Sequence, residues 1–439
     1  MRTYRFKQLF ALLVCLAALR PHGTAFSSAA RQAGDAARPA VVFKADDEIP
    51  PEIRRATFVL VWETIRDKYF DPSFGGKDWN AIRSRYESLL EESKTSRDFH
   101  SLLGQMLKEL GRSHLGIAAP HQLPGGTKAN PVIEMVPDGI ALCLGEGRIM
   151  LASVRPDSPA WAAGLRPGYV LVKAGDAALP TAEEIRTSAL RAVAAALQAL
   201  AGQPSSTAVL TVLDENDKER SVTLPRDVPF QARANLVKTK FEHRRVHPRV
   251  GYIRFDGWGF DLVPKLQAAM KDLWDSDGFI LDCRQNRGGV NPGVDYLAAV
   301  LSAEPGLLAV EISREGERRE WSHKGSGADT YRGRLAILVD GGSGSASEAF
   351  AGAMQEKGRA VILGQTSVGG VLNSTQVSLP TGGILNYAHS DMKTPKGNSI
   401  EGRGVIPDVP VEISRADLLK GKDSVIERAM AEILKSSLS

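Results

Sequence analysis

Cysteine is scarce in this chain, with three residues in 439, and this scarcity excludes a disulfide-stapled fold. Cys15 lies in the N-terminal apolar run, which leaves Cys143 and Cys283 for one bridge at most. Both lie in apolar runs (ALCL and ILDC), so we expect buried free thiols. The sequence also lacks an HExxH motif, a P-loop and a dinucleotide fingerprint, so no metal ion and no cofactor is predicted.

No apolar run in the sequence is long enough to span a bilayer. The best candidate, Leu9 to Leu19, is short, and it follows the basic residues Arg2, Arg5 and Lys7, which is the pattern of a secretory signal peptide. We therefore predict a signal over residues 1–25, a linker over 26–48 and an exported protein, periplasmic or extracellular. An uncleaved membrane anchor is the alternative.

An excess of charge is also missing once this signal is set aside. Residues 1–25 contain four basic and no acidic side chains, which accounts for the whole net charge of +4. The remaining chain is neutral, so nucleic acid is not an expected partner. The hydrophobic content of 43% excludes a disordered chain, and the length predicts about three domains.

Residues 49–127 have the pattern of a small helical domain. Phe58, Val61, Trp62, Ile65 and Tyr69 recur at spacings of three and four, which predicts one amphipathic helix. Further helices are predicted over 79–90 and 96–110.

Residues 128–228 alternate short β-like runs with turns, apart from a predicted helix over 181–201. The stretch Ser158-Pro159-Ala160, followed by Ala163-Gly164-Leu165 and Gly168, resembles the signature of a PDZ domain. Tyr169 departs from the aspartate that is usual there. The resemblance implies a module that captures peptide C-termini by adding a strand to its sheet.

Residues 229–439 alternate apolar runs with helical segments, which predicts an α/β core. Strands are expected at 250–255, 278–283, 335–340 and 360–365, and helices at 292–302 and 347–358. A terminal amphipathic helix is expected over 415–436. His243 and His247 run into the first of these strands, so a helical zinc motif is not expected there.

Ser345 is the candidate nucleophile, because the segment 342–348 (GSGSASE) lies between an apolar strand and a helix. The unpaired amides at a helix N-terminus favour an oxyanion. The competing interpretation is structural, since Ser345 and Glu348 also form a capping-box pattern.

The neighbouring segment 282–289 (DCRQNRGG) ends another strand in a Gly-Gly turn. Together with Ser345-Ala346-Ser347-Glu348, it resembles the catalytic domain of C-terminal processing peptidases, also called tail-specific proteases. The resemblance covers most of the chain after the signal. It implies a multidomain α/β protein: a protease–crotonase (ClpP/crotonase-like) α/β core, a PDZ-like β-rich domain and an N-terminal helical bundle.

This family has two catalytic versions. One uses a Ser–Lys dyad, but Gly370 stands here at the position that matches the lysine. The other resembles the tricorn protease core, which uses serine, histidine and glutamate. The matching histidine is His114, and Arg112 replaces the acidic residue that usually precedes it by two positions.

The resemblance assigns the remaining roles. Glu401, which precedes the Gly-Val-Ile-Pro-Asp segment, is the carboxylate that would orient His114; Asp408 is its rival. Ser113 matches an auxiliary serine that helps to hold the glutamate. The amides of Gly289 and Ala346 would form the oxyanion hole.

We therefore expect a serine endopeptidase that cleaves unfolded polypeptides or protein C-terminal regions. A catalytically silent relative that binds peptides or apolar ligands is one alternative, and a base recruited from Lys393 or Lys396 is another. The sequence leaves open a monomer or a homo-oligomer.

Overall fold

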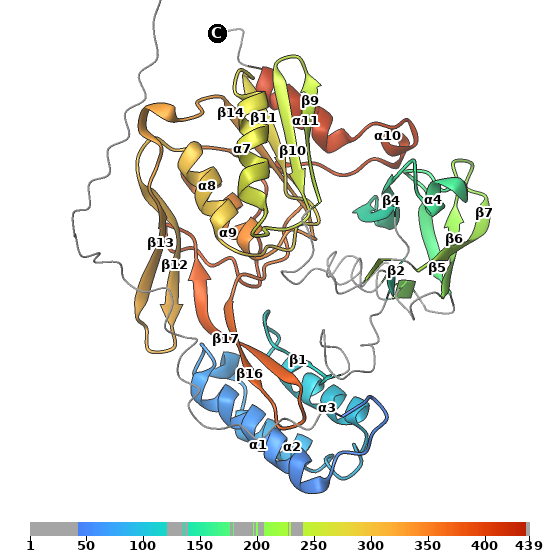
Figure 1. The fold of residues 1–439 in the computed structure, drawn as a ribbon, viewed down its shortest axis with the longest axis vertical. Coiled ribbons are helices and arrows are strands. Elements are labelled where there is room, and N and C mark those ends of the chain that lie inside the picture. The colour runs from blue at the N-terminus through green and yellow to red at the C-terminus, as the bar shows by residue number, and fades with distance from the viewer. Residues whose placement is uncertain are drawn as a thin grey trace, which may run out of the picture. The chain divides into compact units, whose positions relative to one another are not determined.

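A computed structural model describes residues 43–120, 139–175, 206–226 and 240–435, with positions 135–136, 179, 196, 199–200 and 228–229 between them (Figure 1). The predicted signal peptide and most of the predicted helix over 181–201 lie outside these residues; Ala196, Ala199 and Leu200 are helical. Within the described ranges, no helix combines the length and the apolarity that a bilayer crossing requires.

The C-terminal half of the chain is built on a six-stranded sheet. Its order is β18-β15-β14-β11-β10-β9, and all neighbours are parallel except β9 and β10. The strands are β9 (Phe241–His247), β10 (Val250–Phe255), β11 (Gly278–Asp282), β14 (Arg334–Val339), β15 (Val361–Gly364) and β18 (Val409–Pro410). The four predicted strands are thus confirmed, and both histidines lie in β9.

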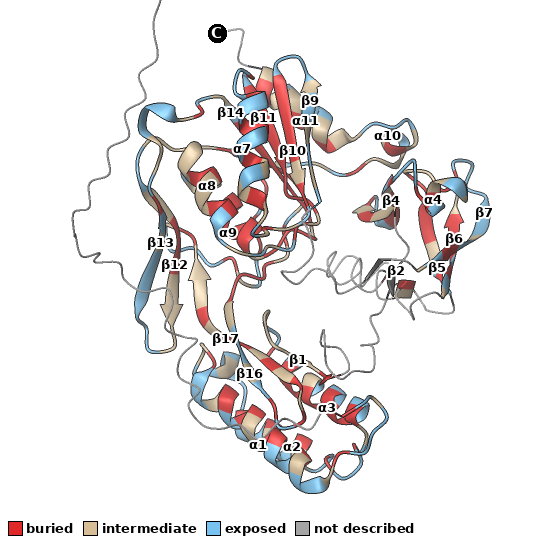
Figure 2. Ribbon diagram, in the orientation of Figure 1, coloured by how far each residue is buried: buried red, intermediate tan, exposed pale blue. Residues whose placement is uncertain are grey.

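Helices cover both faces of this sheet, as parallel sheets require. On one face, α7 (Leu262–Leu273), α8 (Pro292–Val300) and α9 (Ala346–Glu356) pack against strand side chains such as Ile253 and Leu281. On the other face, α11 (Ser424–Leu434) packs against side chains such as Tyr252 and Ile280. Successive residues of a strand therefore pack into the hydrophobic cores on opposite faces of the sheet. This explains why nearly every residue of β10 and β11 is buried (Figure 2).

A second sheet was not predicted. Its order is β1-β17-β12-β13, with β16 also paired to β17. The strands are β1 (Gly116–Ala118), β12 (Gly306–Ser313), β13 (Arg318–His323), β16 (Asn373–Ser378) and β17 (Ile384–Lys393). Short 3-10 turns occur at Phe74–Gly76 and Gly327–Asp329.

The three predicted N-terminal helices are confirmed as α1 (Pro51–Lys68), α2 (Trp79–Glu87) and α3 (Ser96–Lys108). Asp78 and Thr95 cap the second and third by accepting hydrogen bonds from helix amides. The apolar faces of these helices pack against one another and also against Leu385 and Tyr387 of β17, which belong to the same hydrophobic core. The helices are thereby attached to the strand that leads toward Glu401.

The β-rich segment forms a five-stranded antiparallel sheet in the order β3-β4-β5-β6-β7. Its strands are β3 (Ile140–Gly145), β4 (Arg148–Val154), β5 (Val170–Ala174), β6 (Thr207–Leu213) and β7 (Glu219–Pro225); β2 (Met135–Val136) pairs with β8 (Val228–Pro229). Ser158 caps the short helix α4 (Pro159–Ala162). The Tyr169 hydroxyl donates a hydrogen bond to Glu215.

The prediction of one terminal helix over 415–436 was wrong. The chain forms α10 (Arg415–Leu419) and then α11, because Gly421 adopts a positive φ of 71° between them. Asp423 then starts α11 by accepting hydrogen bonds from the amides of Val425 and Ile426.

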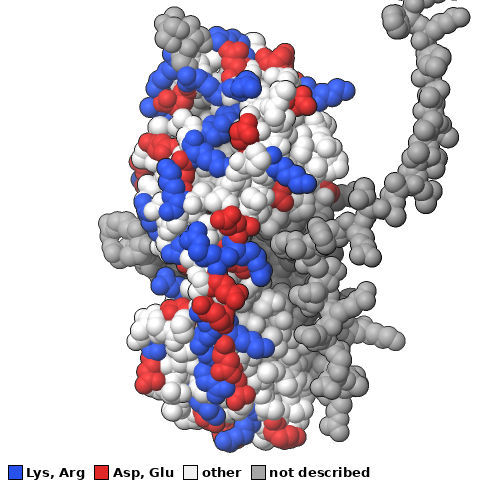
Figure 3. All heavy atoms as spheres, turned by 90° about the vertical axis from the view of Figure 1, so that its left-hand side faces the viewer, with Lys and Arg blue, Asp and Glu red and all other residues white. Residues whose placement is uncertain are grey.

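The cysteine expectation is confirmed: Cys143 and Cys283 are free and buried. Burial raises the pKa of Cys143 to about 12, so this thiol stays protonated. The face drawn in Figure 3 carries basic and acidic side chains interspersed, without a large patch of one sign.

A buried ion cluster joins the end of β11 to the start of α11. Asp282 is fully buried and accepts hydrogen bonds from Arg284 at 2.7 and 2.9 Å and from the Tyr252 hydroxyl at 2.7 Å. Burial raises the pKa of Asp282, but Arg284 and Arg254 outweigh it, and the pKa lies well below its usual range. Arg284 also donates to Asp423 at 2.8 and 3.2 Å. The Asp-x-Arg part of the segment is thus a structural clamp.

We predict that Asp423→Ala lowers the stability of the fold by about 1–2 kcal/mol, because it removes a helix cap and a partly exposed partner of Arg284. Asp423→Asn is the matched control, since it keeps an acceptor for the cap and loses only the charge. Urea unfolding should rank wild type above Asn above Ala. Equal midpoints for all three would show that this link adds nothing.

Candidate active site

Two parallel strands end at the same edge of the large sheet, and each is followed by one of the predicted motifs. β11 leads into residues 283–289, and β14 leads into residues 340–345. Because ligands bind outside the carboxyl ends of parallel strands, this edge is the natural place for a site.

Ser345 lies between β14 and α9 in a strained backbone conformation. Its φ is 53° and its ψ is −117°, a region that residues with a side chain rarely adopt. A residue held there costs of order 1–3 kcal/mol, which the surrounding structure must supply. The strain places the side chain at the N-terminal end of α9.

Asn286 holds the two motifs together and was not singled out from the sequence. Its carbonyl accepts hydrogen bonds from the Gly344 amide at 3.0 Å and from the Ser347 hydroxyl at 3.0 Å. Its side chain accepts from the Gly288 amide and donates to the Phe255 carbonyl. The fully buried Asn286 therefore fixes the Gly-Gly turn against the nucleophile turn.

The two amides predicted for the oxyanion hole, those of Gly289 and Ala346, lie in surroundings that leave them free to bind a negatively charged oxygen. Gly289 is exposed, and a Cβ on the preceding Gly288 would lie 2.7 Å from Ser345 Cβ and 2.8 Å from the Ala346 amide nitrogen. The turn is thus packed directly on Ser345. Among the described residues, neither the Gly289 amide nor the Ala346 amide donates a hydrogen bond, so both remain available.

His114, Ser113 and Glu401 are joined by hydrogen bonds. The Ser113 hydroxyl lies 2.8 Å from His114 Nδ1 and donates to Glu401 Oε2 at 2.9 Å. The Ser113 amide donates to Glu401 Oε1 at 2.9 Å. Because the Ser113 hydroxyl uses its proton in the hydrogen bond to Glu401, its oxygen accepts a hydrogen bond from Nδ1–H of His114. The Nε2 atom of the neutral imidazole ring is then unprotonated. The carboxylate therefore acts on His114 through Ser113 rather than directly.

Two further contacts fix this arrangement. The Val371 amide donates to Glu401 Oε2 at 3.0 Å, and the side-chain amide of Asn386 in β17 donates to the His114 carbonyl at 3.0 Å. His114 itself has a positive φ of 55°. Asn386 lies far from His114 in the sequence, so only the tertiary structure brings it to the site.

The predicted nucleophile and the predicted base are not joined by a hydrogen bond in this structure. Among the described residues, no hydrogen bond connects Ser345 Oγ with His114 Nε2. In enzymes without bound substrate, such hydrogen bonds are often long and tighten only in the complex.

The alternative candidates Asp408, Lys393 and Lys396 contact other residues. Asp408 accepts hydrogen bonds from the Ile362 amide and from Gln355, at the far end of α9. Lys393 pairs with Asp391 at 3.6 Å, and the amide of Lys396 donates to Glu356. None of these contacts reaches His114 or Ser345.

Gly370 lies next to Ser113, the residue that precedes the predicted base His114. A Cβ at this position would lie 3.3 Å from Ser113 Cβ and 3.6 Å from Ser113 Oγ. The position that carries the lysine in the dyad version therefore faces the serine that supports the histidine here.

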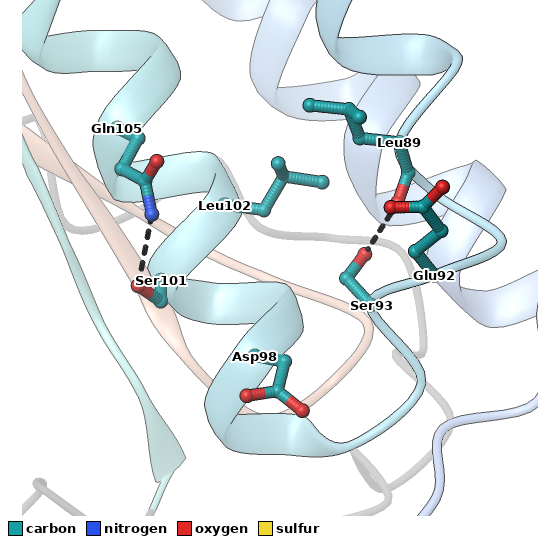
Figure 4. A pocket seen from close by; sticks show the side chains of 7 residues that line it. All are labelled: Leu89, Glu92, Ser93, Asp98, Ser101, Leu102 and Gln105. Carbon is teal, nitrogen blue, oxygen red and sulfur yellow. Dashed lines mark hydrogen bonds between the residues drawn. The ribbon is translucent and has the colours of Figure 1, made fainter.

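A surface pocket of about 260 Å³ lies elsewhere, on α3 and the loop before it (Figure 4). It is lined by Leu89, Glu92, Ser93, Asp98, Ser101, Leu102 and Gln105. None of these belongs to the catalytic constellation. The described part of the chain contains no cluster of three metal-binding side chains.

Comparison with known proteins agrees with this geometry. Residues 249–411 match the model of peptidase family S41, and residues 50–108 match the tricorn protease C1 domain. Residues 249–411 are an S41 peptidase domain. The S41 match spans both strand-end motifs and Glu401, and the tricorn match ends six residues before His114. These matches favour the peptidase over the catalytically silent alternative.

Individual relatives show the same relationship. The chain is 27% identical to the chloroplastic C-terminal processing peptidase of Tetradesmus obliquus, over 81% of this chain and 76% of the relative. It is 26% identical to the carboxyl-terminal-processing protease of Synechocystis, over 84% of each. The solved structure of the photosystem II D1 C-terminal processing protease shares the fold, with a TM-score of 0.56 and 22% identity over 85% of this chain and 98% of that one.

The strained backbone of Ser345 predicts how two substitutions at this position affect stability. Ser345→Gly and Ser345→Ala both remove the hydroxyl, but only glycine adopts φ 53° and ψ −117° without steric cost. We expect the glycine variant to be more stable than the alanine variant by about 1 kcal/mol. Thermal unfolding of both variants checks this, and a more stable alanine variant would contradict it.

The surroundings of His114 predict the pH below which the activity falls, that is, the acid limb of the pH–rate profile. Burial lowers the pKa of His114, Glu401 partly opposes this, and the net pKa lies below the ordinary 6.5. A base must be neutral, so a lowered pKa extends activity toward acid, and kcat/KM should fall only below pH 6.5.

Glu401→Gln removes the charge that raises the pKa of His114, so it should move this limb to still lower pH. It should also reduce kcat by roughly 10²–10⁴, because the imidazolium loses its support. A pH–rate profile of both forms is the measurement. A limb that moves toward neutral pH in Glu401→Gln would contradict the assignment.

Proposed function

We propose that this protein is an exported serine endopeptidase that cleaves unfolded polypeptides or the C-terminal regions of proteins through an acyl-enzyme on Ser345. One observation carries the proposal: the Ser113 hydroxyl bridges His114 Nδ1 and the Glu401 carboxylate. A histidine so held presents an unprotonated Nε2, which is what a general base requires.

In the acylation step, His114 Nε2 accepts the proton of Ser345 Oγ as this oxygen attacks the carbonyl carbon of the scissile peptide. The amides of Gly289 and Ala346 stabilise the negative oxygen of the tetrahedral intermediate, aided by the N-terminal end of α9. When the C–N bond breaks, His114 gives its proton to the leaving amine. The carboxylate of Glu401, acting through Ser113, stabilises the imidazolium in between.

Deacylation repeats the same steps with water. His114 takes a proton from the attacking water, the second tetrahedral intermediate forms on the same two amides, and the proton returns to Ser345 Oγ as the ester breaks. One water is consumed, and one carboxylate and one amine are released. No cofactor enters this balance.

The five-stranded β3–β7 sheet is the proposed PDZ-like module for substrate C-termini. Support comes from the segment 158–168 and from β3, which among the described strands lies at an edge of its sheet and pairs with β4 alone. An edge strand can accept an added peptide strand. The predicted signal peptide supports a periplasmic or extracellular location.

The test is hydrolysis of an unfolded polypeptide by the purified full chain, together with labelling by a fluorophosphonate. We expect Ser345→Ala to abolish labelling, and both Ser345→Ala and His114→Ala to lower kcat by at least about 10³, as in other serine hydrolases. Lys396→Ala is the control and should retain activity.

Either of two results would overturn the proposal. Hydrolysis that survives in Ser345→Ala would assign the nucleophile elsewhere. Hydrolysis that survives in His114→Ala but is lost in Lys393→Ala or Lys396→Ala would assign the base to a lysine.

A further inference from the structure

Glu348, in the first turn of α9, is a fully buried carboxylate that the proposed mechanism does not use. Its Oε2 accepts hydrogen bonds from the amides of Ser345 at 3.0 Å and Gly370 at 2.9 Å. Its Oε1 accepts from the Ser367 hydroxyl at 2.5 Å and the Gly369 amide at 2.6 Å. One side chain thus contacts the nucleophile residue and the loop 367–370.

These four hydrogen bonds occupy all the acceptor sites of the Glu348 carboxylate. An ionised carboxyl group has two oxygens with about four lone-pair sites, and each oxygen here receives two donors. A helix cap alone would use only the contact with Ser345. The other three donors come from a loop about 20 residues further along the chain, so Glu348 does more than cap α9.

The same loop supports the base. After Gly370 comes Val371, whose amide donates to Glu401. The Gly369 carbonyl accepts from the Gly402 amide at 2.8 Å, and the Ser367 hydroxyl accepts from the Val405 amide at 2.7 Å. Both contacts fix the turn that contains Glu401.

This packing leaves little room for the loop to shift. A Cβ on Gly369 would lie 2.8 Å from the Gly404 amide nitrogen, and one on Gly404 would lie 2.5 Å from the Ser367 carbonyl oxygen. Both glycines have positive φ. The loop and the Glu401 turn therefore move together or not at all.

We propose that Glu348 is a positioning residue that sets the distance between the nucleophile and its base, because its buried carboxylate holds the Ser345 turn on one side and, through the loop 367–371, the Glu401–Ser113–His114 relay on the other. The role rests on the proposed function of that site. Burial raises the pKa of Glu348 above its ordinary value, and the four hydrogen bonds oppose this rise.

The test compares Glu348→Gln with Glu348→Asp. Glutamine keeps the shape but presents an NH₂ group to two of the four donors, whereas aspartate keeps the charge on a shorter stem. Glu356→Gln is the matched control: Glu356 lies at the other end of α9 and also accepts from a loop, through Thr394, Lys396 and Asn398.

The first measurement is independent of activity. Hydrogen–deuterium exchange should be at least tenfold faster over 367–371 in Glu348→Gln than in wild type, and unchanged there in Glu356→Gln. Unchanged exchange over 367–371 in Glu348→Gln would overturn the proposal, whatever the chain catalyses.

The second measurement is kinetic. Since a displacement of about 1 Å between reacting groups costs roughly 10²-fold, kcat should fall about a hundredfold in Glu348→Gln with KM within threefold of wild type. Glu348→Asp should recover part of that loss. Equal kcat losses in Glu348→Gln and Glu356→Gln would show a merely structural role and sink the proposal. Failure of wild type to react with the fluorophosphonate would instead count against the proposed function, while the exchange result still decides the role of Glu348.

Discussion

The arrangement of this site depends on a carboxylate buried where four donors converge. Glu348 starts from the helix that follows the nucleophile, and its partners lie in the loop that leads to the support of the base. Burying a charge is expensive unless its hydrogen bonds are filled, so this carboxylate tolerates few alternative arrangements of its neighbours. The strained backbone of Ser345 is held in the same place by the same contacts.

The central sheet could be predicted because its strands are continuous apolar runs, such as 278–282 and 334–339, each ending in a motif. The second sheet could not. β16 has the sequence NSTQVS and β13 has RREWSH, and neither has the alternation that marks a half-buried strand. β16 forms because β17 offers it a partner, and β13 forms because β12 does. A local sequence pattern does not contain this information.

In the candidate site too, some residues could be predicted from the sequence and others only from the tertiary structure. Ser345, His114 and Glu401 could be singled out because each matches a motif of the family, although they come from three distant parts of the chain. The contact of Ser113 with Glu401 was expected from the resemblance, and that of Glu348 with Ser345 from the capping-box pattern, which the structure confirms. The contact of Ser113 with His114 Nδ1, those of Asn286 and Asn386, and those of Glu348 with the loop 367–370 were visible only in the structure. Locally, Glu348 has the pattern of a helix cap, and its additional donors are distant in sequence.

The missing side chain at Gly370 constrains how such a site can change over evolutionary time. A side chain here would press on Ser113, with 3.3 Å between the two Cβ atoms, so a lysine at 370 and the serine that supports His114 compete for one space. A lysine at 370 therefore requires Ser113 to shift by a few tenths of an ångström, which disturbs the hydrogen bonds that Ser113 makes with His114 and Glu401. A lineage that passes from the histidine version to the lysine version is thus expected to change position 113 along with position 370.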